Sequence, residues 1–183
     1  MSQHTEHPIR YEYTSCEARD FSVLKGIRTQ DLEALDSFPA EQRGLVQDLK
    51  DIISITQSEM ERLNEASPLI PVDTTDLIIE RLTRTSARAV LLKLEDSTDP
   101  RGYSIQGFSR CYLDPNDFPD PDIPLDLKTQ GYCRFDRFFI RDLGRTYQAR
   151  GKAAQALIDE MYRIIGPDKK LVAMILEGGE GVH

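Results

Sequence analysis

The chain has 183 residues, of which 39% are hydrophobic and 30% are charged, a balance typical of a globular protein with one core. Its formal net charge of −8 argues against a nucleic-acid-binding surface, which depends on clustered Lys and Arg side chains. No apolar run reaches the length of about 18 residues that a membrane helix needs, and the polar start of the chain does not resemble a signal peptide. We therefore expect one cytoplasmic domain over residues 1–183 and no membrane partner.

The three cysteines, Cys16, Cys111 and Cys133, are odd in number and show no C-x-x-C spacing. Neither a disulfide framework nor a zinc site is indicated by such a pattern. We expect all three side chains to be buried thiols.

The first part of the chain predicts a strand followed by two helices. Residues 9–15 alternate apolar or aromatic side chains with polar ones, which is the period of a half-buried strand. Apolar residues then recur at helical intervals in a long segment: Leu45, Val46, Leu49, Ile52, Ile53, Met60 and Leu63. Pro68 and Pro71 end this helix, and Asp73 or Thr74 can cap a second helix that carries Leu77, Ile78 and Leu82.

From residue 87 the pattern predicts strands. Two apolar segments, 89–94 and 103–108, flank a stretch of turn-forming residues at 96–102, which indicates a β-hairpin. Residues 114–126 contain five Asp and four Pro, so we expect an exposed loop there. The order of calcium ligands found in EF-hands is absent from this loop, and no metal site is expected.

The last part predicts a strand, a helix and a second strand. Residues 133–140 are rich in aromatic side chains, as strands are, and residues 153–165 carry one helical apolar stripe. The continuous apolar run 171–176 indicates a strand buried on both faces, so the helix forms a parallel crossover. The domain thus divides into residues 1–86, with a strand and helices, and residues 87–176, with the hairpin and the β-turn-α-β unit.

The segment 148–153 lies between the aromatic strand and its helix. Unpaired backbone N–H groups and a positive dipole end make a helix start a binding site for phosphate, and a glycine lets the phosphate approach closely. Gly151 supplies the glycine, and Arg150 and Lys152 add positive charge. The spacing fits neither a Walker A motif nor the dinucleotide-binding fingerprint.

Gln148, Gly151 and Ala153 satisfy the pattern [QR]-x-x-G-x-[GA], and with it the chain resembles the GNAT superfamily of N-acyltransferases. The order of strand, two helices, hairpin, strand, helix and strand is also similar to that superfamily, most closely over residues 88–176. The resemblance implies an α/β (α+β) fold with a mixed, mostly antiparallel sheet flanked by helices. It also implies acetyl-CoA or another acyl-CoA as co-substrate, and an amine-bearing acceptor.

The resemblance assigns two groups of residues to the acyl-CoA. The backbone amides of the turn would hold the pyrophosphate, and the backbone at the end of the preceding strand would pair with the pantetheine arm. The candidates are Gln148, Ala149, Arg150, Gly151, Lys152, Ala153 and Ala154 at the turn, and Ile140 and Arg141 at the strand end. An acidic loop at 114–126 would attract a cationic acceptor.

Acyl transfer to an amine needs a base that removes a proton from the amine. Counting back by twos from Ile140 places Asp136 on the same face of the strand as Phe138, so Asp136 is the first candidate base. An ion pair between Asp136 and a neighbouring Arg is the alternative. Glu177, after the last strand, is the second candidate, and Tyr147 and His183 are weaker ones.

The chain departs from the resemblance at its end. GNAT proteins continue with another helix, which often carries a Tyr that acts as general acid, and with two more strands, whereas this sequence ends at His183. We therefore expect a homodimer or a partner chain that completes the sheet. Two alternatives to an enzyme stay open: a non-catalytic GNAT-like binding module, and an α/β domain in which residues 148–153 are simply a helix start.

Overall fold

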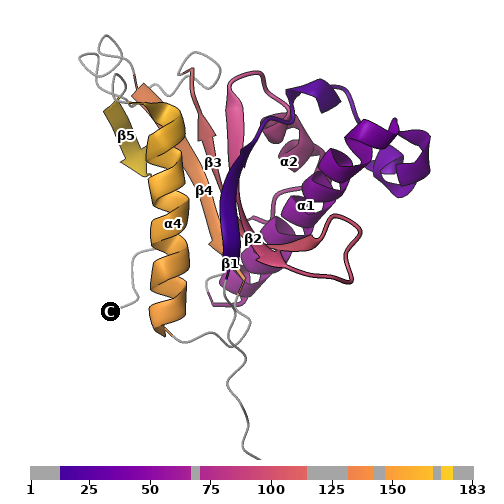
Figure 1. Cartoon of the computed structure of the whole chain (residues 1–183). Coiled ribbons are helices and arrows are strands. Elements are labelled where there is room, and N and C mark those ends of the chain that lie inside the picture. Colours follow the sequence, from indigo (N-terminus) through magenta and orange to yellow (C-terminus); the bar gives the residue numbers. More distant parts are fainter. Residues whose placement is uncertain (1–12, 67–70, 115–131, 142–146, 167–169, 175–183) are drawn as a thin grey trace, which may run out of the picture.

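The computed structural model describes residues 13–66, 71–114, 132–141, 147–166 and 170–174. Figure 1 shows the arrangement of the elements. Their order is β1 (Tyr13–Arg19), three short 3-10 turns, namely η1 (Ser22–Leu24), η2 (Thr29–Glu33) and η3 (Leu35–Ser37), α1 (Ala40–Ala66), α2 (Thr75–Leu82), β2 (Ala87–Glu95), β3 (Tyr103–Tyr112), β4 (Tyr132–Ile140), α4 (Tyr147–Ile165) and β5 (Lys170–Met174).

The five strands form one sheet in the order β1-β2-β3-β4-β5. The first three pairs are antiparallel, and β4 pairs with β5 in parallel through the crossover helix α4. The predicted mixed, mostly antiparallel sheet flanked by helices is thus confirmed. The elements also follow the order that the resemblance to the GNAT superfamily implies.

Helices cover both faces of the sheet. In Figure 1, α4 lies on one side of the strands and α1 and α2 lie on the other. Leu91 of β2 belongs to the core under α1 and α2, whereas its neighbours Val90 and Leu92 pack with Leu157 of α4. Burial on both faces explains why β2 is an unbroken apolar run and does not alternate. None of the described helices combines the length and the apolar character that a bilayer span requires.

The N-terminal elements agree with the sequence apart from one boundary. β1 continues to Arg19, four residues beyond the predicted end, because Cys16 and Ala18 pair with Leu92 and Val90 of β2. Residues 9–12 of the predicted strand lie outside the described ranges. Of the two predicted caps of α2, Thr74 is the one that acts, since its hydroxyl accepts a hydrogen bond of 3.3 Å from the Leu77 amide.

The largest difference from the sequence-based prediction is the start of α4. The helix begins at Tyr147, six residues before the predicted start at Ala153. The segment 148–152 is therefore helical and is not a turn. Of the predicted acidic loop only Asp114 is described, and residues 175 and 176 of the last predicted strand also lie outside the described ranges.

β3 and β4 approach each other closely at Gly107, which faces Ile140 across the ladder. A Cβ atom on Gly107 would lie 2.6 Å from the carbonyl oxygen of Phe139, well inside van der Waals contact. The neighbouring residue Gln106 is an extra residue of β3, because Leu92 faces Gly107 and Lys93 already faces Ile105. A β-bulge and a glycine therefore fix the position of the β4 end.

A buried carboxylate connects α1 to the sheet. The Asp48 side chain is 1% exposed and accepts hydrogen bonds from Arg101 (2.7 Å) in the hairpin turn, from Tyr103 (2.9 Å) and from Arg19 (3.2 Å) at the end of β1. Burial opposes the charge of Arg101, but hydrogen bonds to Asp99, Asp51 and Asp48 outweigh it and raise the pKa of this guanidinium. The network holds α1 against both β1 and the hairpin.

We expect Gly107→Ala to lower the free energy of unfolding by about 1–3 kcal/mol, because the new methyl group forces β3 and β4 apart. Gly151→Ala is the matched control: a Cβ at Gly151 meets no atom within 4 Å, and alanine is the better helix former by about 0.5–1 kcal/mol. Urea unfolding followed by circular dichroism measures the stability of both variants. Equal midpoints for wild type and Gly107→Ala would contradict the close approach.

Candidate functional site

The end of β4 and the start of α4 meet at one end of the sheet. Ile140 faces Gly107, and Gly107 faces Leu92, so β4 ends beside the β2–β3 hairpin. Tyr147 opens α4 shortly after β4 ends at Ile140. This is the place where the sequence predicts the phosphate site.

The backbone amides that α4 leaves unpaired differ from the predicted ones. In an α-helix each N–H binds the carbonyl four residues earlier, and the first bond goes to the residue before the helix, so amides from Arg150 onward are used in a helix that begins at Tyr147. The unpaired amides belong to the first turn, which includes Gln148 and Ala149. Among the predicted pyrophosphate ligands, Ala153 is fully buried in the core. A phosphate at this helix end thus meets residues 147–150 first.

The charges at this helix start are the reverse of the usual preference. The first turn of α4 carries no acidic residue. Instead Arg150 and Lys152 are exposed in the first two turns. Cations at the positive end of a helix dipole are unfavourable by themselves, whereas an anion bound there is stabilised by the dipole and the cations together. The local charge pattern therefore favours an anionic ligand.

Gly151 has no packing role that would explain a glycine. It is exposed within α4, and an added Cβ would meet no atom within 4 Å. Glycine in a helix costs about 0.5–1 kcal/mol relative to alanine. A residue that weakens its own helix without relieving a contact is typical of a functional position, where a small side chain lets a ligand come near the backbone.

Only one of the two predicted strand-end residues offers its backbone away from β3. The Arg141 amide donates a hydrogen bond of 2.8 Å to the Gln106 carbonyl, so this amide is already used inside the sheet. Successive residues of a strand direct their backbone groups to opposite sides, and the backbone of Ile140 therefore faces the β5 side. The pairing of β4 with β5 ends, within the described residues, at Phe135 and Met174.

Asp136, the first candidate base, occupies a β-bulge. Arg110 faces Arg137 and Cys111 faces Phe135, so Asp136 is an extra residue of β4. Counting by twos assumes an unbroken alternation, which a bulge interrupts, and bulges are frequent next to active sites. The role of Asp136 as base stays a prediction. The side chains of Asp136 and Tyr147, and all of Glu177 and His183, lie outside what the structure describes.

The thiols are not poised for covalent catalysis. None of the three cysteines forms a disulfide, Cys111 and Cys133 are buried, and Cys16 is half-buried beneath α4. Burial, followed by the negative charges of Glu160 and Asp159, raises the pKa of Cys16 from 9.0 to about 11. The described ranges also hold no cluster of three His, Cys, Asp or Glu side chains that could bind a metal ion.

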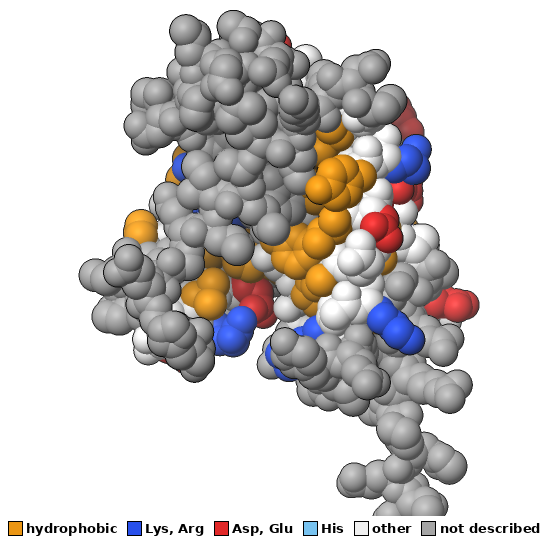
Figure 2. All heavy atoms as spheres, turned by 90° about the vertical axis from the view of Figure 1, so that its left-hand side faces the viewer, with side chains coloured by type: hydrophobic (Ala, Val, Ile, Leu, Met, Phe, Trp, Pro, Cys, Tyr) orange, Lys and Arg blue, Asp and Glu red, His pale blue; other side chains and the backbone are white. Residues whose placement is uncertain are grey.

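The side of the molecule formed by α4 carries exposed apolar surface. Tyr162 is 55% exposed, and Ile158 and Ala154, each one turn earlier, are half-buried. Figure 2 faces this side and shows hydrophobic side chains gathered in a strip, with acidic and basic side chains along one side of it. The homodimer or partner chain that the sequence led us to expect stays a prediction.

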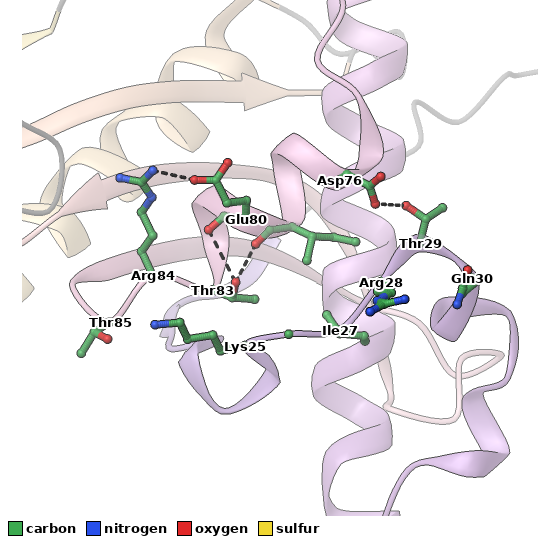
Figure 3. A pocket seen from close by; sticks show the side chains of 12 residues that line it. Lys25, Ile27, Arg28, Thr29, Gln30, Asp76, Glu80, Thr83, Arg84 and Thr85 are labelled. Carbon is green, nitrogen blue, oxygen red and sulfur yellow. Dashed lines mark hydrogen bonds and ion pairs between the residues drawn. The ribbon is translucent and has the colours of Figure 1, made fainter.

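A cleft of about 770 Å³ lies on the other side of the sheet, between residues 25–30 and α2. Figure 3 shows Lys25, Arg28 and Gln30 from the first segment beside Asp76, Glu80 and Arg84 from α2 and its C-terminal end. The sequence reasoning missed this cleft, because residues 16–37 carry no clear period. The closely spaced cations Lys25 and Arg28 are the one signal there that could have been noticed.

No family model matches this chain, and no curated protein matches it in sequence. One solved structure that matches in part is the crystal structure of a ribosomal-protein-alanine N-acetyltransferase from Brucella melitensis biovar Abortus 2308, at 18% identity and a TM-score of 0.34. The match covers 62% of this chain and 64% of that chain, less than two thirds of its length.

We expect Cys16 to react about a hundredfold more slowly with Ellman's reagent at neutral pH than a thiol of ordinary pKa, because little thiolate is present. Its reaction rate should rise about tenfold per pH unit until the pH approaches the pKa. Stopped-flow absorbance of wild type and Cys16→Ser isolates this thiol, and unfolded protein gives the reference rate. A rate that levels off below pH 9 would contradict the raised pKa.

Proposed function

We propose that the protein is a GNAT-type N-acyltransferase that moves an acyl group from acetyl-CoA or another acyl-CoA to an amine. The observation that carries the proposal is the start of α4, where Gly151, Arg150 and Lys152 follow β4 in a parallel crossover. Gln148, Gly151 and Ala153 fit the acyl-CoA signature at this point of the chain.

The pyrophosphate of the acyl-CoA would bind at the first turn of α4. Unpaired amides at residues 147–149 would donate hydrogen bonds to it, and the helix dipole would stabilise its charge. Arg150 and Lys152 add positive charge at the same helix end, and the missing side chain of Gly151 leaves room for the phosphate. The pantetheine arm would pair with the backbone of Ile140 on the side that faces away from β3.

In the reaction the amine nitrogen attacks the thioester carbonyl carbon, forming a C–N bond and a tetrahedral oxyanion. Collapse of this intermediate breaks the C–S bond and releases the thiolate of coenzyme A, which takes up a proton. The base that removes the amine proton is Asp136 or Glu177 in this proposal. A covalent acyl-cysteine is not part of it, because Cys16 has a raised pKa and the other two thiols are buried.

The acceptor class follows from charge. With a formal net charge of −8, the protein attracts cations over a long range at low ionic strength, which favours an amine that is protonated in solution. A base near the reaction centre is then required, because only the neutral amine attacks. The specific amine, small molecule or protein, would be found by screening.

The proposal predicts that wild type binds acetyl-CoA and coenzyme A saturably and that Gly151→Glu does not. A carboxylate at this position repels the pyrophosphate and fills the space in front of the helix start. Isothermal titration calorimetry measures both, with Gly151→Ala as the matched control for the change of backbone freedom. The control should bind, with affinity reduced less than in Gly151→Glu.

Absence of binding by wild type would overturn the acyltransferase proposal. Binding without release of free thiol in the presence of a panel of primary amines would favour the alternative, a non-catalytic GNAT-like binding module. Equal affinities of wild type and Gly151→Glu would show that the ligand sits elsewhere.

Once turnover is found, Asp136→Asn tests the base. Loss of a general base lowers the rate by about 10²–10⁴-fold and removes the limb of the pH–rate profile that reports its ionisation. Rates of thiol release between pH 5 and 10, measured for both proteins, check this, and circular dichroism confirms that the bulge variant folds. An unchanged rate and profile would eliminate Asp136 and leave Glu177 as the candidate.

A further inference from the structure

The cleft between residues 25–30 and α2 is separate from the start of α4. β2 begins at Ala87, two residues after the cleft residue Thr85, and Ala87 faces Tyr112 at the end of β3. The cleft therefore lies at the end of the sheet opposite the β4 end. It also lies on the opposite face, because Ile79 of α2 belongs to the core cluster that excludes α4. A ligand in the cleft would not compete with one at α4.

The floor of the cleft is apolar, and the buried Thr83 hydroxyl beside it is hydrogen-bonded. Ile79 is 3% exposed, and Ile27 is half-buried against the same core cluster. The Thr83 hydroxyl donates a hydrogen bond of 2.9 Å to the Ile79 carbonyl. A volume of about 770 Å³ lies within the range of small-molecule sites, which extends from about 300 to 1,000 Å³. The floor thus suits the apolar body of a small molecule.

The rim carries positive charge that the protein does not use. Both acidic side chains of the cleft have partners within it: Asp76 accepts a hydrogen bond of 2.5 Å from Thr29, and Glu80 pairs with Arg84 at 2.6 Å. Lys25 and Arg28 are exposed, and neither has an ion-pair partner among the described residues. Three cations against two carboxylates leave an excess of one positive charge on the rim.

The negative net charge of the protein repels an anion, whereas the cations of the cleft attract it. The distance of each charge from the ligand decides whether repulsion or attraction prevails. At physiological ionic strength the Debye length is about 8 Å, so charges elsewhere on the surface are largely screened. Lys25 and Arg28 line the cleft, so either side chain can contact a ligand directly. Charged hydrogen bonds of this kind each contribute about 1.5–3 kcal/mol when a ligand excludes water.

We infer that the cleft binds a small organic anion, a carboxylate or a phosphate ester on an apolar body. The oxyanion pairs with Lys25 or with Arg28 on the rim, and the apolar body covers Ile79 and Ile27, which lies between these two cations. This assignment does not depend on acyl transfer at α4. It gives the protein a second ligand site, through which an acidic metabolite can stabilise the folded state.

Titration of the ¹⁵N-labelled protein with benzoate and with phenyl phosphate, followed by NMR, tests the inference. We expect saturable shifts of amides at residues 25–30 and 76–85 with at least one of the two probes. Inorganic phosphate and benzyl alcohol, which carry the anion or the apolar body alone, should bind at least about tenfold more weakly. The two anionic probes distinguish a carboxylate ligand from a phosphate ester.

The double variant Lys25→Gln and Arg28→Gln should weaken the binding of the anionic probe at least about tenfold. The matched control, Lys50→Gln with Arg62→Gln, removes the same charge from α1 outside the cleft and should leave binding unchanged. If both variants bound the probe equally weakly, the effect would arise from net charge alone, and the inference would be overturned. The inference would also be overturned if inorganic phosphate bound as tightly as phenyl phosphate, or if the amide shifts fell outside the cleft with every probe. Thermal melts verify that both variants are folded.

Discussion

The buried carboxylate of Asp48 is the constraint on which the arrangement of this molecule depends. A charge that is 1% exposed must be matched by cations and donors, and Arg101, Tyr103 and Arg19 come to it from the hairpin turn, β3 and β1, respectively. Breaking such a buried pair costs about 3–5 kcal/mol, because the remaining charge stays buried. The network therefore sets where α1 lies, and α1 with α2 closes one face of the sheet.

Closing that face determines how the two candidate sites are separated. α4 covers the other face, so its start and the β4 end form one site at the hairpin end of the sheet. The cleft beside α2 lies at the other end and on the other face. Each site holds a feature that its own element does not need: a glycine at a helix start, and an excess of one positive charge on the rim of the cleft. Folding alone gives no reason for either arrangement.

The sequence predicted the elements wherever one period held. The helical stripe of α1, the cap at Thr74, the hairpin and β4 all follow from side-chain spacing and turn chemistry, which are local properties. The predicted start of α4 was wrong because it was placed where the apolar stripe begins, at Ala153. Gln148, Ala149 and Arg150 do not extend this stripe, but they are good helix formers. A helix can begin before its buried face does.

The amino-acid sequence by itself determined the fold class, the order of the strands along the chain and the segment around Gly151, since these depend on neighbours in sequence. Only the tertiary structure decided that Asp136 is a bulge residue, that the Arg141 amide is already paired, and that Lys25 and Arg28 line a cleft with α2. The reason is physical. These features depend on residues that are far apart in the chain, so no local pattern encodes them. They include the strand registers, the close approach at Gly107 and the pairing of the buried Asp48 carboxylate.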